Sequence, residues 1–316
     1  VKEYNVDGFR FDLMGIHDVE TMQIIRDELD KVDPRILTYG EGWDMGTGLL
    51  PQDKAKKDNA YQLLDIGFFN DNERDAIKGA EVFGTLKAGF VSGQGTENII
   101  AKAILGSSEL GSYLMPNQVV NYVEAHDNYN LHDLLREFHP HDDLETLTKR
   151  IELATAMNIL MQGLAFMELG QEFSRTKLVG TGPNGQVTQA DKERAMNSYN
   201  APDQVNQVDW NLLSKHQDSV NFIRQIIQLK TTRKEFSYST YEEIYQHVYV
   251  RHAQTNSGLI IFEVKDKKHY LVVFNASGTP YRLENADQLK LVVSNNRSKI
   301  KTEVENLTAS VFEILA

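Results

Sequence analysis

Apolar and polar residues alternate with two periods in the first part of the chain, one typical of strands and one typical of helices. Residues 8–12 read Gly-Phe-Arg-Phe-Asp, and their period of two predicts a strand. Residues 22–32 carry apolar side chains at helical spacing after Asp18, a residue type that caps helices, and Pro34 ends this helix. Residues 36–40 predict a second strand, so the chain begins with a parallel strand–helix–strand unit.

The same alternation continues as far as residue 234. Three more strands are predicted over residues 63–69, 119–125 and 164–169, and a helix is predicted over residues 147–161. Five strands that alternate with helical patterns indicate an α/β domain with a parallel sheet.

Three polar or glycine-rich stretches interrupt this pattern. Residues 174–210 contain several Gly, Pro and Asn residues and predict one long loop, a kind of segment that is usually functional or mobile. The glycines of residues 84–111 predict turns between short helical pieces. Residues 54–57 read Lys-Ala-Lys-Lys, and we interpret this basic run as solvated surface.

After residue 234 the pattern changes to short runs that favour β-structure. These runs cover residues 245–250, 259–264, 269–275 and 288–293, and turn-forming residues separate them. They predict an antiparallel β-sandwich with no catalytic group of its own. We therefore divide the chain into an α/β domain over 1–234 and an all-β domain over 235–316.

Composition narrows the class of protein. The 316 residues are 41% hydrophobic and 25% charged, which is ordinary for a soluble globular protein. The net charge of −12 argues against nucleic acid or an anionic membrane as a partner, since no basic surplus neutralises phosphates. The absence of cysteine excludes disulfides and thiolate metal sites, and no apolar run is long enough to predict a membrane span.

The end of the first strand carries the first candidate chemistry. Arg10 and Asp12 lie on the same face of that strand, and a permanent guanidinium charge keeps a neighbouring carboxylate ionised. An ionised and positioned aspartate is what covalent catalysis requires of a nucleophile. A salt bridge that ends the strand explains the same pair, so these two residues alone leave both interpretations open.

Three segments taken together point to a family. Residues 7–15, 38–44 and 122–128 resemble, in this order, the signature regions of the α-amylase superfamily of glycoside hydrolases. The similarity is closest to type I pullulanases, the α-1,6 debranching enzymes. Further stretches fit that subfamily, namely Phe69-Asn70-Asp71, Gly170-Gln171-Glu172-Phe173, Asn197-Ser198-Tyr199-Asn200 and Val205-Asn206-Gln207-Val208-Asp209-Trp210.

The resemblance implies a fold. The three signature regions lie on strands 4, 5 and 7 of the family's (β/α)8 barrel, so this chain is expected to hold strands 4 to 8 of a TIM barrel, followed by the β-sandwich. The chain opens almost directly in a strand and without an initiator Met. We therefore expect an upstream part of the same polypeptide to complete the barrel, and we expect residues 1–316 alone to be a poor hydrolase.

The resemblance also implies site residues. Asp12 corresponds to the nucleophile, Glu41 to the acid/base, and Asp127 to the carboxylate that holds the sugar at the cleavage point. Glu41 lies beside Trp43, and an apolar neighbour favours the protonated form that a general acid needs. The residues expected to bind substrate are Arg10, Trp43, His126, Asn128, Asn197, Tyr199, Asp203 and Asn206.

These assignments predict an enzyme that cleaves α-1,6-glucosidic branch points of pullulan, glycogen or amylopectin with retention of configuration. An isoamylase or an α-1,4-acting amylase is the alternative within the superfamily, and a non-catalytic α-glucan-binding protein is the alternative from another class. No cofactor is required, and the histidines lack the spacing of a zinc site. The sequence does not decide whether a structural calcium ion binds.

Overall fold

Five short parallel strands form one sheet in the computed structural model, which describes residues 1–82, 85–297 and 302–315. In sheet order these are β1 (Gly8–Phe11), β2 (Leu37–Gly40), β3 (Gly67–Phe69), β6 (Val119–Asn121) and β7 (Leu164–Ala165). The five predicted strands and their order are confirmed, and the parallel sheet has the arrangement of part of a barrel. All five strands are shorter than predicted, the first two by one residue each. In the case of β6 the buried run continues past the sheet, since Tyr122 and Val123 are buried beyond the end of the strand.

The first helix confirms its predicted cap. Helix α1 (Val19–Asp30) begins after Asp18, whose Oδ1 accepts a hydrogen bond of 2.6 Å from the backbone N–H of Thr21. The helix buries Arg26 beside its apolar positions, and this guanidinium donates to the carbonyl of Ile36 at 2.6 Å and to Thr38 Oγ1 at 2.7 Å. Arg26 thus ties α1 to the start of β2.

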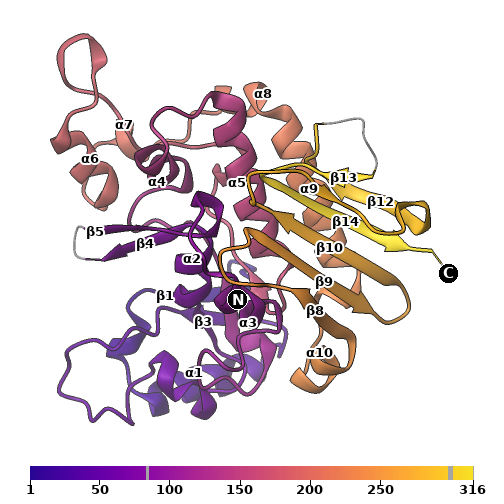
Figure 1. Cartoon of the computed structure of the whole chain (residues 1–316). Coiled ribbons are helices and arrows are strands. Elements are labelled where there is room, and N and C mark those ends of the chain that lie inside the picture. The colour runs from indigo at the N-terminus through magenta and orange to yellow at the C-terminus, as the bar shows by residue number, and fades with distance from the viewer. Residues whose placement is uncertain (83–84, 298–301, 316) are drawn as a thin grey trace.

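The other helices surround the sheet or follow it (Figure 1). They are α2 (Asp71–Ile77), α3 (Glu97–Ile104), α4 (Leu131–Phe138), α5 (Leu144–Leu160), α8 (Asn211–Lys215), α9 (Gln217–Thr232) and α10 (Tyr241–His247). Short 3-10 turns are η1 (Met14–Ile16), η2 (Lys57–Gln62), η3 (Phe90–Ser92), η4 (Pro116–Gln118), η5 (Gln171–Phe173), η6 (Pro183–Gly185), η7 (Lys234–Phe236) and η8 (Ala286–Gln288). A hairpin of β4 (Gly79–Val82) and β5 (Thr85–Ala88) was not predicted, and Gly84 at its turn lies outside the described residues.

The prediction of one long loop over residues 174–210 was wrong in part. This segment contains two helices, α6 (Gln189–Met196) and α7 (Asp203–Asn206). A capping box begins α6, in which the backbone N–H of Asp191 donates to Thr188 Oγ1 and the N–H of Thr188 donates to Asp191 Oδ2. Helix α6 is almost entirely polar and buries little besides Ala195, so the apolar periodicity that reveals other helices is missing here.

The carboxyl-terminal part forms an antiparallel sheet. Its strand order is β12 (Leu289–Ser294), β14 (Thr308–Ile314), β10 (His269–Asn275), β9 (Leu259–Lys265) and β8 (Val248–His252). The four predicted strands are present, but the first was placed too early: residues 245–247 belong to helix α10, and β8 begins at Val248. Strand β14 was not predicted, although it pairs with two neighbours. A small second sheet of β11 (Tyr281–Arg282) and β13 (Glu303–Val304) was not predicted either.

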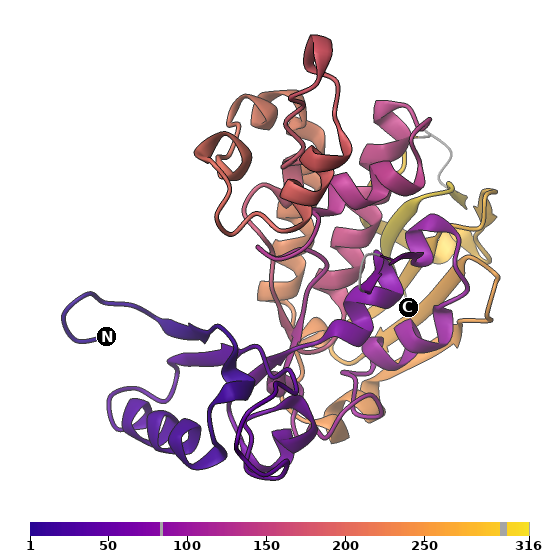
Figure 2. The ribbon, with the colours of Figure 1, turned by 90° about the vertical axis from the view of Figure 1, so that its left-hand side faces the viewer.

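The two faces of the antiparallel sheet contact different layers. One face packs on α5 and α9, as Figures 1 and 2 show, and its side chains belong to the same apolar core as those helices. The other face packs on β11 and β13 through a smaller apolar cluster that includes Ile261, Val273 and Phe312. Neighbouring residues on β9 therefore point to opposite layers, as the period of two requires. The domain boundary at residue 234 stays a prediction, since one apolar core runs across it.

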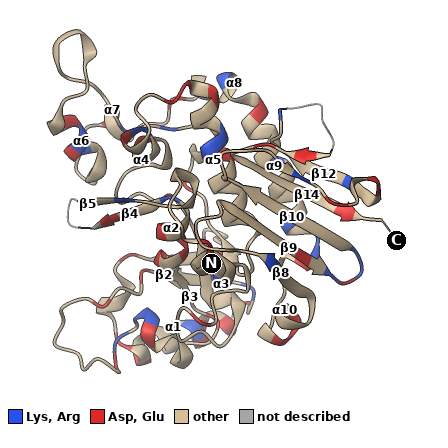
Figure 3. Cartoon of the chain, in the orientation of Figure 1, with Lys and Arg blue, Asp and Glu red and all other residues tan. Residues whose placement is uncertain are grey.

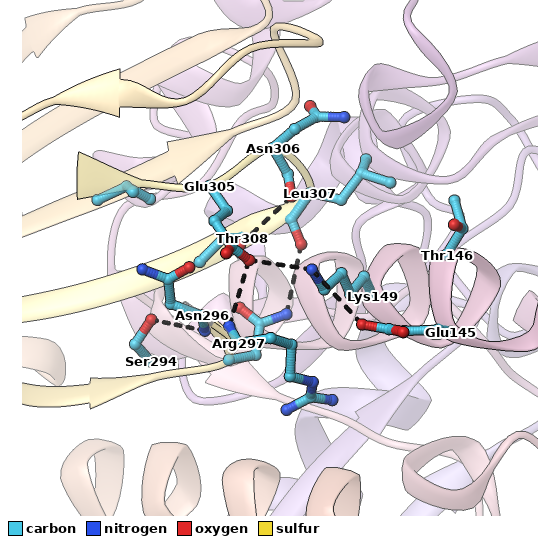
Figure 4. A network of polar contacts seen from close by, with 12 residues as sticks. Glu145, Thr146, Lys149, Ser294, Asn296, Arg297, Glu305, Asn306, Leu307 and Thr308 are labelled. Carbon is cyan, nitrogen blue, oxygen red and sulfur yellow. Dashed lines mark hydrogen bonds and ion pairs between the residues drawn. The ribbon is translucent and has the colours of Figure 1, made fainter. Parts of the chain in front are cut away.

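Polar contacts reinforce this junction. Lys149 Nζ on α5 lies 3.0 Å from Glu305 Oε2 and 3.9 Å from Glu145 Oε1, and the backbone N–H of Arg297 also donates to Glu305 (Figure 4). One helical turn further along, the buried carboxylate of Glu152 accepts hydrogen bonds from α9 and from the 294–297 segment.

Basic and acidic residues are interspersed along the helices and strands of both parts of the chain (Figure 3). Among the described residues, none of the helices combines the length and the apolar character needed to cross a lipid bilayer.

Candidate active site

The carboxyl ends of three parallel strands meet at one cavity of about 200 Å³. Asp12 follows β1, Glu41 follows β2, and the 125–128 segment follows β6. The cavity is lined by Arg10, Glu41, Trp43, Phe69, Asp71, Arg74, Lys78, Tyr122, Ala125, Asp127 and Asn128. This is the end of a parallel barrel at which active sites are found.

Arg10 joins the first two carboxylates. Its Nη1 donates to Asp12 Oδ1, and its Nη2 donates to Glu41 Oε1 at 2.7 Å. The guanidinium carbon also lies 5.6 Å from the centre of the Phe69 ring, which supports the charge from one side. The fork geometry of arginine lets one cation hold two carboxylates in a fixed relation.

Glu41 is the buried member of the pair. Its side chain is 6% exposed, against 57% for Asp12, and its Oε2 accepts a hydrogen bond of 2.9 Å from the backbone N–H of Leu13. Leu13 has a φ of 46°, a left-handed conformation that a branched side chain rarely adopts. The turn after Asp12 is therefore strained, and this conformation directs the backbone N–H of Leu13 toward Glu41.

His126 connects Asp12 to the third carboxylate. Its Nε2 lies 3.5 Å from Asp12 Oδ1 and 3.4 Å from Asp127 Oδ1, and all three side chains are about half exposed. Asn128, the next residue, has a φ of 64° and turns the chain away from the site. Each of the two exposed aspartates is thus followed directly by a residue in the left-handed conformation.

One carboxylate oxygen of Asp12, one of Glu41 and one ring nitrogen of His126 lie within 4.8 Å of one another. Atoms that bind a metal ion can have the same spacing. The guanidinium of Arg10 already donates to both carboxylates. A second positive charge at this point would be repelled by the first. We therefore describe the three side chains as one hydrogen-bonded group around Arg10 and assign no metal to them.

The basic run at residues 54–57 was wrongly interpreted as solvated surface. Lys54 and Lys56 are buried, and their ammonium groups lie 2.8 Å and 2.9 Å from the two carboxylate oxygens of Asp44. The hydrogen bonds from Lys54 and Lys56 lower the pKa of Asp44 to about 2. These ion pairs close the base of the loop that follows Trp43. Lys57 pairs with Asp71 in the cavity wall.

Asp12 and five of the predicted substrate-binding residues are not among the residues that line the cavity. Asp12 and His126 lie beside it, where they contact Arg10 and Asp127 of its lining. The other four come from one segment. Asn197, Tyr199, Asp203 and Asn206 all belong to the 174–210 segment, and Tyr199 is 80% exposed. The side-chain amide of Asn206 donates to the carbonyl of Ser198 at 2.8 Å, so it supports its own loop. Contact of these four residues with a sugar stays a prediction.

Six cavity residues were not predicted as site residues: Phe69, Asp71, Arg74, Lys78, Tyr122 and Ala125. Arg74 Nη1 donates to Tyr122 Oη at 2.7 Å, and its guanidinium lies over the tyrosine ring. Burial raises the pKa of the Tyr122 hydroxyl, so it stays protonated. Asp71 could have been predicted from the sequence as a site residue, because it closely follows the end of a predicted strand, as Asp12 and Glu41 do.

No family model matches the chain. Among curated proteins, the pullulanase of Bacillus subtilis (strain 168) is 34% identical over 296 residues, which make up 90% of this chain and 39% of that protein. Pullulanase A of Streptococcus pneumoniae is 25% identical over 282 residues and is matched over 22% of its length. The chain thus spans well under half the length of these relatives.

Solved structures give the same result. Pullulanase from Anoxybacillus sp. LM18-11, in complex with maltotetraose, aligns with a TM-score of 0.86 and 35% identity over 99% of this chain and 44% of that one. Pullulanase from Paenibacillus barengoltzii, in complex with maltohexaose and α-cyclodextrin, aligns with a TM-score of 0.85 and 35% identity over 100% of this chain and 49% of that one. The fold is shared over nearly the whole length of this chain.

Proposed function

We propose that this chain, which belongs to the type I pullulanases of the α-amylase superfamily, carries the cleavage site of a glycoside hydrolase that cuts α-1,6-glucosidic branch points with retention of configuration. The proposal rests on one observation above all: carboxylate oxygens of Asp12 and Glu41 lie within 4.8 Å of one another. Retaining glycosidases hold their two carboxyl groups about 5–5.5 Å apart, whereas inverting enzymes leave room for a water molecule between them.

In this proposal Asp12 attacks the anomeric carbon while Glu41 gives a proton to the leaving glycosidic oxygen. A covalent glycosyl ester forms on Asp12, and water then hydrolyses it with Glu41 acting as the base. Arg10 donates to both carboxylates and so holds Asp12 and Glu41 in a fixed relation. The two roles differ because Asp12 is open to an incoming sugar ring, whereas Glu41 is buried.

Asp127 and His126 supply the sugar-binding part of the site. Their position beside Asp12 suits hydrogen bonds to ring hydroxyls and stabilisation of the oxocarbenium-like transition state. Trp43 lines the same cavity and offers a flat apolar face for a glucose ring. Solved relatives that hold maltotetraose or maltohexaose support an α-glucan as the substrate class.

We also propose that further strands of the same polypeptide complete the barrel. Strands β1 and β7 each pair on one side only, and a TIM barrel needs eight strands to close. Open edges leave backbone donors and acceptors without partners. We therefore expect residues 1–316 alone to hydrolyse pullulan poorly and to lack a sharp melting transition as a monomer.

Incubation of the full polypeptide with pullulan tests the function. Release of maltotriose as the sole product supports α-1,6 debranching, and its anomeric form at early times is expected to be α, because two inversions at the anomeric carbon restore the configuration. Cleavage at α-1,4 linkages would instead indicate an amylase. Tight binding of α-glucan without any cleavage would indicate a binding protein.

A further inference from the structure

Lys177 lies behind the backbone of the cleavage site, although it lines no part of the cavity. Its side chain is buried, and its ammonium donates three hydrogen bonds. The acceptors are the carbonyl of His126 at 3.2 Å, the carbonyl of Asn128 at 2.7 Å and the hydroxyl of Ser198 at 3.2 Å. Because His126 and Asn128 flank Asp127, the ammonium holds both neighbours of this carboxylate. All three donor hydrogens of the ammonium are used.

The backbone around Lys177 is itself anchored. The N–H of Lys177 donates to Asp133 Oδ2 at 2.8 Å, and the hydroxyl of Thr176 donates to Asp133 Oδ1 at 2.5 Å. Asp133 is fully buried on α4, so it fixes where the lysine side chain begins. Burial lowers the pKa of the Lys177 ammonium, and the nearby carboxylates of Asp133 and Glu124 oppose that change.

Two other buried side chains hold the residues that follow this turn. Glu124 accepts from the backbone N–H of Leu131 at 2.6 Å and from the side-chain amide of Asn130 at 3.2 Å. Lys78 Nζ donates to the carbonyl of Tyr129 at 3.1 Å. Lys177 holds the middle of the turn, where Asn128 has its left-handed backbone conformation.

We propose, on the basis of the function proposed above, that Lys177 is a positioning residue. Its ammonium fixes residues 126–128 relative to Ser198, so that these two segments form one binding surface for the glucan. Through Ser198 the ammonium connects the cleavage site to the neighbours of Ser198, Asn197 and Tyr199. This contact gives residues that lie outside the cavity a route by which they would affect substrate binding. The segment over residues 174–210 then contributes to recognition of the glucan chain beyond the cleavage point.

Two variants of the full polypeptide separate the two halves of this role. Lys177→Met removes the ammonium and keeps the length of the side chain, and we expect kcat on pullulan to fall by about 10²-fold, as small displacements at an active site do. Ser198→Ala removes only the acceptor on the 174–210 segment. It is expected to raise KM for pullulan several-fold while kcat stays within about twofold of wild type.

Lys230→Met is the matched control. Lys230 is also buried, and its ammonium also donates three hydrogen bonds, to the carbonyls of Met161, Gly163 and Phe236 at 2.6, 2.9 and 2.7 Å. Its loss is expected to lower the melting temperature and to leave kcat and KM of the folded protein unchanged. Lys177→Met is expected to change the kinetic constants at a temperature where both variants are folded.

The outcomes decide between this inference and the proposed function. A folded Lys177→Met variant with wild-type kcat and KM overturns the positioning role, while pullulan cleavage by the wild type keeps the proposed function. If Lys177→Met does not fold, an unchanged KM in Ser198→Ala overturns the role. A wild-type protein that does not cleave pullulan overturns the proposed function, and the inference fails with it.

Discussion

The backbone N–H of Leu13 donates a hydrogen bond of 2.9 Å to Glu41 Oε2, so the residue after Asp12 holds the other carboxylate of the pair. The other oxygen of this carboxylate, Glu41 Oε1, accepts a hydrogen bond of 2.7 Å from Arg10 Nη2. Both donors come from the β1 segment, on either side of Asp12. The distance between the two carboxylates is therefore set by a few residues of one strand end, and it does not depend on the packing of distant helices.

The first prediction concerns the proton donor. Glu41→Gln keeps the size of the side chain and an oxygen for the N–H of Leu13, but an amide has no proton to give to a leaving oxygen. We expect kcat on pullulan to fall by about 10²–10⁴-fold, the contribution typical of general acid catalysis. The melting temperature, measured on the same preparation, should stay close to that of the wild type. Near-normal hydrolysis by this variant would contradict the assignment.

The second prediction concerns the fork of Arg10. Arg10→Lys keeps a positive charge but offers one nitrogen in place of two, so it cannot hold Asp12 and Glu41 together. We expect kcat to fall by at least about tenfold, because the two carboxylates lose their fixed relation.

Arg35→Lys is the control for this change. Arg35 also pairs with an aspartate two residues away, Asp33, but its side chain is 88% exposed and it precedes β2, whereas Glu41 follows that strand. This variant should keep wild-type kcat. Equal kinetic constants in both variants would show that Arg10 has no role beyond its charge.

Sequence periodicity was sufficient for the parallel sheet, because each strand is a short apolar run bounded by turn-forming or capping residues. The order of the strands and the placement of Asp12 and Glu41 at their carboxyl ends follow directly from that pattern. Residues 122–125 were assigned to a strand because Tyr122, Val123 and Ala125 continue the apolar run, but the backbone leaves the sheet after Asn121 to form the turn that carries Asp127. A buried turn and a buried strand look alike in composition.

The rest of the site depends on contacts that local patterns do not encode. Lys54 and Lys56 read as surface residues, since nothing in their neighbourhood indicates that Asp44, ten residues or more away, closes the loop onto them. Arg74 lines the cavity because α2 packs beside β6, where the Arg74 guanidinium donates to the Tyr122 hydroxyl. Such pairings arise from the tertiary fold, and the sequence predicts neither partner.

The third prediction concerns the junction between α5 and the antiparallel sheet. Glu152 accepts hydrogen bonds from Ser219 Oγ at 2.7 Å, Asn295 Nδ2 at 2.9 Å and Arg297 Nη2 at 2.9 Å, and it is buried. Glu152→Ala leaves buried donors without an acceptor and should lower the free energy of unfolding by about 1.5–3 kcal/mol. Chemical denaturation of the full polypeptide measures this loss.

Glu145→Ala on the same helix is the control. Glu145 is 68% exposed and lies 3.9 Å from Lys149, an arrangement that contributes little to stability. We expect its free energy of unfolding to stay within about 0.5 kcal/mol of wild type. A loss from Glu152→Ala no larger than this would mean that the apolar core alone holds the sheet to α5.

The fourth prediction concerns the pH dependence of stability at the turn that carries Asp127. Burial raises the pKa of Glu124 to about 8, against the opposing effects of the Leu131 N–H and the Lys78 charge. A carboxyl group whose pKa is higher in the folded state holds a proton there that the unfolded chain has released. Its contribution to stability is therefore complete below its ordinary pKa, near 4.5, and is lost as the pH rises through about 8.

Glu124→Gln removes this titration, because the amide is neutral at every pH. The melting temperature of the wild type minus that of the variant should be largest at pH 5 and should shrink steadily up to pH 8. Asp143→Asn is the control, since a hydrogen bond from the Thr146 backbone lowers the pKa of Asp143 and its contribution is lost only as the pH falls below the ordinary value of 3.8. Its difference from the wild type should stay constant between pH 5 and 8. A difference for Glu124→Gln that is equally constant would mean that Glu124 is ionised in the folded protein, with the charge balanced by Lys78 and Lys177.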